Sequence, residues 1–383
     1  MKTCVEILRD LVSIPSVSTM SNRPVIDYVQ RYLDPEHWRS TLHVYRDRAG
    51  VEKVNLVAFA GPGNGRSAEL AFVCHTDTVP FDAEWIEAVR PVVRDCRLCG
   101  RGSCDVKSVL ACALAAVQGG GVANLAHPLA LVLTADEEIG CLGAKHLAGA
   151  RAFESCYMVI GEPTGLTAVH AGKGYASGEI VVHGAPAHSA FPMKGRSAIR
   201  DAARVLERLD KVSERLASES DSKFDPPFTT LNIGLISGGT AKNVIPGECR
   251  MTVEWRPIPG QEARWAATLI EEQLATLADE FPGFNARLEV TRLDPPFGPN
   301  SAGRVTRLLE SLTGRLSTTV SFGTEAAHLA ALASEVVVFG PGDMVVAHKT
   351  GEFVPTSELE ECTGYFRNLI KTLCGEQRGS SVR

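Results

Sequence analysis

Short runs of apolar residues without polar alternation recur through the first and last parts of the chain. An unbroken apolar run of strand length is typical of a strand that is buried on both faces. The runs that predict such strands cover residues 55–60, 70–74, 128–135, 157–160 and 335–339. Helical patterns lie between them, most clearly over residues 106–118. The alternation predicts an α/β domain with a doubly wound, largely parallel sheet covered by helices.

The middle of the chain has a different pattern. Residues 175–183 alternate between apolar and polar side chains, as in a strand with one exposed face. A long amphipathic helix over 197–217 follows, and further patterns predict strand, strand, helix and strand at residues 229–236, 249–255, 261–281 and 286–292. The order β-α-β-β-α-β is that of a ferredoxin-like unit. We expect this unit, residues 173–291, to be inserted into a catalytic domain made of residues 1–172 and 292–383.

The start of the chain also carries a clear helix signal. Thr3 followed three residues later by Glu6 is a capping-box pattern, and it predicts a helix that runs to Val12 and is stopped by Pro15.

Composition narrows the class of protein. The chain has 383 residues, enough for two domains, and its net charge of −6 argues against nucleic acid or an anionic membrane surface as a partner. Its 11 cysteines follow no regular framework, and its N-terminus lacks the apolar core of a signal peptide, which together predict a cytoplasmic protein. Residues 108–135 carry no acidic or basic side chain, but polar residues and glycines interrupt them too often for a membrane span.

Acidic and imidazole side chains follow the predicted strands of the larger domain. In open α/β sheets, ligands bind beyond the carboxyl ends of the strands, so these side chains are expected to converge on one site. They are His75 and Asp77 after residues 70–74, Glu137 and Glu138 after 128–135, Glu162 after 157–160, and His348 after 335–339, with Asp105 just before the helix at 106–118.

Histidine and carboxylate without thiolate form a ligand set for Zn²⁺, with Co²⁺ or Mn²⁺ as substitutes. So many acids in one pocket would repel one another unless cations neutralised them. Two metal ions ~3.5–4 Å apart, sharing one carboxylate, would do so and would hold a water between them. Taken singly, each motif has an ordinary explanation, such as a solvated acidic loop or a helix N-cap at Asp105. Their joint placement at strand ends favours the metal site.

Motifs spread over nearly the whole chain resemble the M20 family of metallopeptidases, and within it the branch that deacetylates acetylornithine. They lie at residues 75–82, 100–107 (Gly-x-Gly-x-x-Asp-x-Lys), 134–138, 160–164, 184–189, 243–246, 256–260, 323–326 and 340–348. Three positions depart from the family pattern: Val106 stands in place of Met, Cys74 in place of Gly, and residues 349–353 replace a Pro-Asp-Glu-Tyr-like stretch. The last of these borders the expected pocket.

The resemblance implies a metal ligand set. His75 and Glu162 would bind one ion, Glu138 and His348 would bind the second, and Asp105 would bridge both. It also implies a zinc-hydrolase-type catalytic domain, with the inserted domain acting as a lid and forming a homodimer.

Catalytic roles are implied in the same way. Asp77 would orient His75 through a hydrogen bond. Glu137 would be the general base, taking a proton from the metal-bridging water and passing it to the leaving amine. His188, from the inserted domain of the same or the partner subunit, would stabilise the tetrahedral oxyanion.

The implied reaction is hydrolysis of N2-acetyl-L-ornithine to L-ornithine and acetate, a step of arginine biosynthesis. Arg256 is a candidate bidentate partner for the substrate α-carboxylate, and Asn243 and Thr324 are further candidate contacts. We hypothesise that Glu325 meets the side-chain ammonium of ornithine. The alternative is that Glu325 is a carboxylate favoured by a helix dipole.

Other substrates would use the same machinery. These are N-acetylcitrulline, N-succinyl-diaminopimelate, and a general N-acyl amino acid or dipeptide. A non-catalytic relative would be expected to have lost a ligand or the base, whereas all of them are present here. Cys96-x-x-Cys99 suggests a zinc knuckle or a redox pair, but no second such motif completes a site, which favours incidental thiols.

Overall fold

The structure is a computed structural model, and it describes residues 1–119, 121–298 and 302–375. The chain divides into two compact units. The first comprises Met1–His170, Gly298–Thr318 and Thr324–Arg383, and the second comprises Ala171–Phe297 and Thr319–Gly323. The insertion expected at residues 173–291 thus lies within the second unit, which extends beyond it at both ends.

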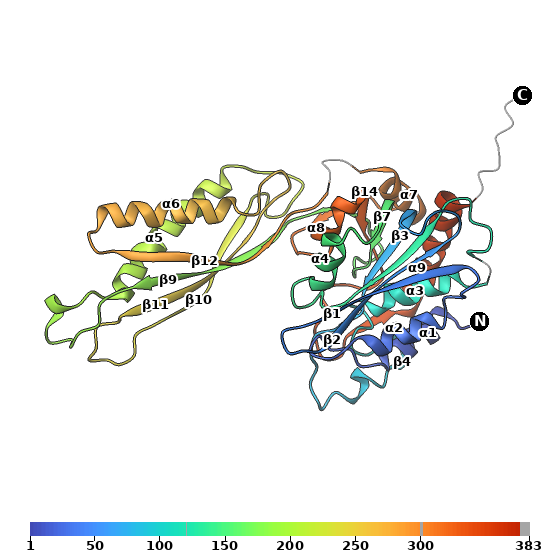
Figure 1. Cartoon of the computed structure of the whole chain (residues 1–383), viewed down its shortest axis with the longest axis horizontal. Helices are drawn as coiled ribbons and strands as arrows, with labels where there is room; N and C mark the ends of the chain where they lie inside the picture. Colours follow the sequence, from blue (N-terminus) through green and yellow to red (C-terminus); the bar gives the residue numbers. More distant parts are fainter. Residues whose placement is uncertain (120, 299–301, 376–383) are drawn as a thin grey trace, which may run out of the picture. The chain divides into compact units, whose positions relative to one another are not determined.

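An eight-stranded sheet forms the centre of the first unit (Figure 1). Its order is β1-β2-β6-β3-β7-β14-β8-β13. The strands are β1 (Trp38–Arg46), β2 (Glu52–Ala60), β3 (Ser67–His75), β6 (Leu129–Thr134), β7 (Glu154–Ile160), β8 (Val169–Gly172), β13 (Thr318–Val320) and β14 (Ala333–Val338). The four central strands β6, β3, β7 and β14 run parallel. All five strands predicted from apolar runs are confirmed, and four of them form this parallel centre.

The sheet is mixed rather than parallel throughout. Strands β1 and β2 form an antiparallel pair, and β2 also runs antiparallel to β6. Strand β1 was not predicted, because most of its side chains are exposed or half-buried and no apolar run marks it. At the other side, β8 pairs with β14 through a single antiparallel contact.

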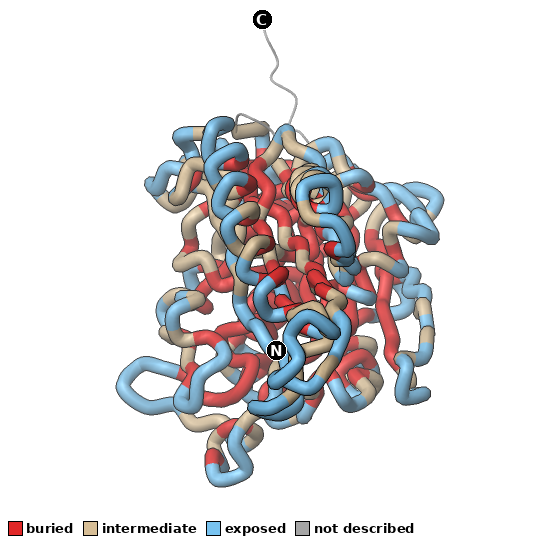
Figure 2. Tube along the Cα trace, turned by 90° about the vertical axis from the view of Figure 1, so that its left-hand side faces the viewer, coloured by how far each residue is buried: buried red, intermediate tan, exposed pale blue. Residues whose placement is uncertain are grey.

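Helices cover both faces of this sheet. Helices α1, α3 and α9 pack together on one face, and α4 and α8 lie on the other (Figure 1). The bounds are α1 (Cys4–Val12), α2 (Arg23–Gln30), α3 (Lys107–Val117), α4 (Leu142–Gly149), α7 (Arg304–Thr313), α8 (Ala326–Leu329) and α9 (Thr356–Leu369). The Thr3–Glu6 capping box is confirmed. Every residue of α3 is buried, as the run without charged side chains from Ser108 onward predicts, and its first residue Lys107 is buried as well. Figure 2 shows such buried segments inside and exposed turns around them.

A small three-stranded sheet completes the first unit. It has the order β15-β5-β4, with β4 (Val92–Arg94), β5 (Arg97–Cys99) and β15 (Phe353–Pro355). Strand β15 pairs antiparallel with β5, which brings the segment after His348 beside the loop that leads to Asp105.

The second unit has the predicted β-α-β-β-α-β order. Its elements are β9 (Tyr175–His183), α5 (Ala198–Ala217), β10 (Thr230–Gly238), β11 (Glu248–Arg256), α6 (Trp265–Glu280) and β12 (Asn285–Asp294). The antiparallel sheet has the order β10-β11-β9-β12, and α5 and α6 pack on one of its faces (Figure 1). The ferredoxin-like prediction is therefore confirmed.

Two further properties concern the whole chain. None of the helices in the described ranges combines the length and apolar character needed to cross a lipid bilayer. All 11 cysteines are free thiols.

Candidate metal centre

The parallel strands deliver acidic and imidazole groups to one edge of the sheet. His75 is the last residue of β3, Glu137 and Glu138 follow β6, and Glu162 follows β7. Asp105 lies just before α3, whose first residue is Lys107. Because neighbouring parallel strands end at the same edge, residues far apart in sequence meet there, as predicted.

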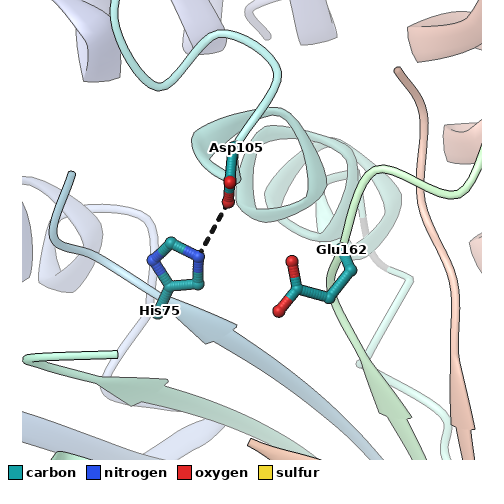
Figure 3. A group of neighbouring side chains, drawn as sticks. All are labelled: His75, Asp105 and Glu162. Carbon is teal, nitrogen blue, oxygen red and sulfur yellow. Dashed lines mark hydrogen bonds and ion pairs between the residues drawn. The ribbon is translucent and has the colours of Figure 1, made fainter. Parts of the chain in front are cut away.

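Two groups of side chains are close enough to hold metal ions. His75, Asp105 and Glu162 form the first, and their side chains point toward one another (Figure 3). Asp105, Glu138 and His348 form the second, and the ligand atoms within each group lie within 4.8 Å of one another. Asp105 belongs to both groups. Its Oδ1 lies 3.0 Å from His75 Nε2 and its Oδ2 lies 3.1 Å from His348 Nε2.

The carboxylates of this site are hard to ionise together. Burial, with the repulsion of neighbouring acids, raises the pKa of Glu137 to about 8 and that of Glu162 well above its usual range. The pKa of Glu138 is also raised, first by burial. In the metal-free protein these carboxyls therefore tend to hold protons at neutral pH, and bound divalent cations would favour their ionised forms instead.

In the histidines and Asp105, by contrast, the pKa shifts favour the charged forms. Hydrogen bonds to Asp105 and Glu138 raise the pKa of His348 to about 10. Burial opposes the protonation of His75, but the bond to Asp105 and the surrounding acids raise its pKa well above the usual value. Burial likewise opposes the ionisation of Asp105, yet the two histidines lower its pKa. These histidines behave as cations only because they face carboxylates, and a metal ion would take the place of their protons.

Asp77 contacts His75 through its main chain and supports the loop that bears Glu137 with its carboxylate. The nearest oxygen to His75 Nδ1 is the main-chain carbonyl of Asp77 at 3.1 Å, whereas the Asp77 carboxylate lies 3.8 Å away. That carboxylate instead accepts hydrogen bonds from the main-chain N–H groups of Glu137 and Glu138, at 3.0 and 3.3 Å, and from Ser18 Oγ at 2.7 Å. Asp77 thus positions the candidate base and one ligand together.

A buried ion pair holds the start of the same loop. Lys53 Nζ lies 2.8 Å from Asp136 Oδ1, and both side chains are almost fully buried. Tyr45 donates a hydrogen bond of 2.9 Å to Asp136 Oδ2. Asp136 has a φ of +58°, in the left-handed region that non-glycine residues seldom adopt. The ion pair fixes the turn that presents Glu137.

The predicted substrate contacts fall in both units. Thr324 and Glu325 belong to the first unit and are buried. Thr324 Oγ1 accepts a hydrogen bond from the main-chain N–H of Ala326, the first residue of α8, and Glu325 is the N-cap of that helix. Glu325 Oε1 accepts no hydrogen bond from the described residues, and burial raises the pKa of Glu325 to about 7.

Arg256, Asn243 and His188 belong to the second unit. His188 is exposed and forms an isolated antiparallel bridge with Val244, beside Asn243. The Arg256 guanidinium stacks on the Tyr175 ring at 4.1 Å and lies 3.5 Å from Glu254 Oε2.

Sequence reasoning missed the residues that support the ligands. Ser18 and Lys53 contact the site segments from positions distant in sequence, whereas Arg101 and Glu352 lie four residues from Asp105 and from His348. Only Lys53 carried a usable signal, since it is a charged residue beside an apolar strand pattern. Cys141 was also missed, and its thiol donates a hydrogen bond of 3.4 Å to Glu137 Oε1.

Comparisons with known proteins agree with this geometry. Residues 71–372 match the model of peptidase family M20/M25/M40. A protein of Myxococcus xanthus named acetylornithine deacetylase is 45% identical over 370 residues, covering 96% of this chain and 97% of that protein. An acetylornithine deacetylase of Proteus mirabilis (strain HI4320) is 31% identical, covering 97% of each chain.

Solved structures share the fold. Aminopeptidase PepT from Bacillus cereus has a TM-score of 0.74 at 21% identity, covering 97% of this chain and 98% of that one. The Bacillus subtilis YXEP protein, described as a dinuclear metal binding peptidase from the M20 family, has a TM-score of 0.67 at 16% identity, covering 97% of each chain.

Proposed function

Because the chain belongs to peptidase family M20/M25/M40 and is a metal-dependent amidohydrolase, we propose that it hydrolyses N2-acetyl-L-ornithine to L-ornithine and acetate. The position of Asp105 is the main support for metal-dependent hydrolysis, because this residue contributes one oxygen to each of two adjoining ligand groups. The observation that favours the substrate is the similarity, over nearly the full length, to proteins named acetylornithine deacetylase.

The residues present fit two divalent ions. His75, Asp105 and Glu162 would hold one ion, and Asp105, Glu138 and His348 the other. The donor set of imidazole and carboxylate suits Zn²⁺, with Co²⁺ or Mn²⁺ as substitutes. Bound there, the two ions would polarise the amide carbonyl and lower the pKa of the attacking water.

Glu137 carries the proton in the proposed mechanism. Its carboxylate is held by the loop that Asp77 fixes, and it has no role in either ligand group. It accepts a proton from the attacking water and delivers it to the nitrogen of the leaving ornithine. His188 would stabilise the oxyanion of the tetrahedral intermediate by donating a hydrogen bond.

Four residues are proposed to select the substrate. Arg256 would bind the α-carboxylate with two of its guanidinium nitrogens, and its stacking on Tyr175 restricts its orientation. Asn243 and Thr324 would add polar contacts. Glu325 would pair with the side-chain ammonium of ornithine, because one of its buried oxygens accepts no hydrogen bond from the described residues.

The Glu325 proposal predicts a change in specificity. Glu325→Gln should lower kcat/KM for acetylornithine while sparing acetylcitrulline, whose ureido group is neutral. An unchanged preference between these two substrates would rule the pairing out.

The substrate itself is tested with a panel. Protein stripped with chelator and reloaded with Zn²⁺ or Co²⁺ is assayed on acetylornithine, acetylcitrulline, succinyl-diaminopimelate and acetylmethionine. We expect metal-dependent turnover with the highest kcat/KM on acetylornithine. A maximum on another compound would keep the chemistry and overturn the substrate.

We also propose a homodimer formed by the second unit. Strand β10 is an edge of its sheet, and Leu235 and Ile236 on that strand are 70% and 54% exposed. An unpaired edge with apolar side chains is a template for a second copy. Light scattering should give twice the chain mass, and Leu235→Lys should shift the protein toward monomer. A wild-type monomer would contradict the proposal.

A cytoplasmic location completes the proposal. Free thiols throughout the chain suit a reducing compartment. Neither nucleic acid nor a membrane is proposed as a partner, given the net charge of −6.

A further inference from the structure

Glu352 is a buried carboxylate with no part in either ligand group. Its side chain is fully buried, and its Oε1 accepts hydrogen bonds from the main-chain N–H groups of Cys104 at 2.9 Å and Asp105 at 3.1 Å. Its Oε2 lies 2.5 Å from Arg101 Nη1. The main-chain oxygen of Glu352 also accepts a hydrogen bond from Gly100 N. Glu352 therefore contacts the loop 100–105 at four points.

This loop ends at the residue on which both ligand groups depend. Asp105 contacts His75 through one oxygen and His348 through the other. A shift of its main chain relative to the His348 segment would change the separation of Asp105 from His348. The other ligands of the first group, His75 and Glu162, are placed by β3 and β7. The bonds from Glu352 to the N–H of Asp105 and of its neighbour Cys104 oppose such a shift.

Glu352 is also tied to the other side of the second ligand group. It follows His348 by four residues, and its N–H donates to Lys349 O at 3.2 Å. Within this short segment His348 has a φ of +62° and Gly351 a φ of +86°, so the chain turns tightly. Strand β15 begins at the next residue, Phe353, and pairs with β5. Glu352 thus anchors the segment that bears His348 and the loop that bears Asp105.

Arg101 makes this anchor stable in the interior. It is 4% exposed, its guanidinium lies 5.2 Å from the centre of the Trp85 ring, and its main-chain N–H donates to Ala88 O. A buried carboxylate without a partner would be costly, whereas a carboxylate that accepts from a guanidinium and two main-chain N–H groups is satisfied.

We propose that Glu352 and Arg101 are positioning residues that hold Asp105 at the separation from His348 required for the second metal ion. The inference rests on the proposed two-metal function and deepens it. Some residues do not bind the metal but hydrogen-bond to its ligands and orient them. Replacing such a residue typically changes metal affinity or activity by about 10–100-fold.

The test is the binding of Co²⁺ to the metal-stripped full chain, followed by calorimetry and by the visible spectrum of Co²⁺. Glu352→Gln retains the size and one accepting oxygen but loses the charge that pairs with Arg101. We expect two ions on the wild type, and on Glu352→Gln one ion of near wild-type affinity and one weakened about 10–100-fold. The altered spectrum should appear only with the second ion, and excess Co²⁺ should restore kcat with little change in KM.

Two further variants keep the test decisive. Glu87→Gln is the matched control, because it breaks the more exposed pair of Glu87 with Arg94, at 2.8 Å, without touching Asp105, and it should bind both ions normally. Arg101→Lys keeps the positive charge and loses the planar guanidinium, so it provides a milder change if Glu352→Gln does not fold.

The outcomes separate this inference from the function on which it rests. Two ions bound by Glu352→Gln, or by Arg101→Lys if that variant is needed, with wild-type affinity and spectrum would overturn the positioning role and leave the proposed function intact. A wild type that binds no divalent metal would remove the proposed function, and this inference with it.

Discussion

At the scale of single residues, the site separates the groups that would bind metal from the group that moves a proton. Five side chains make up the two ligand groups, and Glu137 stands next to them with its main-chain N–H held by Asp77. Its pKa of about 8, raised first by burial, describes a carboxylate that readily holds a proton in this pocket.

Replacement of this base gives the first prediction. Glu137→Gln keeps the shape of the side chain and cannot accept the proton, so kcat on acetylornithine should fall about 10²–10⁴-fold. Bound metal, measured by mass spectrometry, should remain at the wild-type level because Glu137 is in neither ligand group. Loss of metal from this variant, or a kcat within a few-fold of wild type, would contradict the assignment.

The ligands could be recognised from sequence, whereas their supports could not. His75, Glu138 and Glu162 directly follow apolar runs that mark strands, and strand ends meet at one edge for a general reason. Glu352 accepts a hydrogen bond from Asp105, 247 residues away in the sequence, and no local sequence pattern predicts such a contact. The hydrogen bond between Asp77 and His75 that the resemblance implies is made by the main-chain oxygen of Asp77. No pattern in the sequence predicts that the Asp77 carboxylate binds the N–H groups of Glu137 and Glu138.

At the scale of elements, the loop after β6 is held from β2. Lys53 of β2 pairs with Asp136, and its Nζ also donates to the main-chain oxygen of Met20 at 2.9 Å. The ammonium is therefore the common partner of the loop that bears Glu137 and of the segment that contains Met20.

Removal of this ammonium gives the second prediction. Lys53→Met leaves the Asp136 carboxylate buried and unpaired, which should lower the free energy of unfolding by about 3–5 kcal/mol in urea titrations. The double variant Lys53→Met with Asp136→Asn should recover much of this loss, since no unpaired charge remains. Equal stability of the wild type and Lys53→Met would show that the pair is unimportant.

Strands with a continuous apolar pattern were predicted well, and the remaining elements show why others were not. Strand β1 is an exposed edge strand, so its sequence has no regular pattern of apolar residues. Strands β4, β5 and β15 have three residues each and are defined by their mutual pairing rather than by composition. The pairing of β1 with β2 makes one edge of the main sheet antiparallel. The alternation of strands and helices in the sequence does not predict this pairing.

At the scale of the whole molecule, the acidic centre links stability to pH and to metal. In the metal-free protein, Glu137 and Glu325 have pKa values of about 8 and about 7, above the ordinary carboxyl value of 4.5. The folded state therefore holds more protons than the unfolded chain between about pH 4.5 and pH 8. Folding stability falls as pH rises through this window.

The histidines act in the same direction. His348 has a pKa raised to about 10, so its contribution is complete below about pH 6.5 and is lost as pH rises toward 10. The lowered pKa of Asp105 acts in the opposite sense only below its ordinary value of 3.8. Lys107, whose pKa burial lowers to about 7, also acts in the opposite sense above about pH 7, but it is one group against the raised acids and histidines. The third prediction is that chelator-stripped protein has a lower Tm at pH 8.5 than at pH 6. Added Zn²⁺ should raise Tm most at pH 8.5, and a metal-free Tm that is flat or rises over this range would contradict the prediction.

The most direct test of the whole account is a titration of the stripped protein with Co²⁺. Bound metal per chain and the rate of acetate release from acetylornithine are measured in the same samples. We predict negligible turnover without metal and a rate that rises as up to two ions bind per chain. Full turnover in metal-free protein, or two bound ions without turnover of acetylornithine, would contradict it.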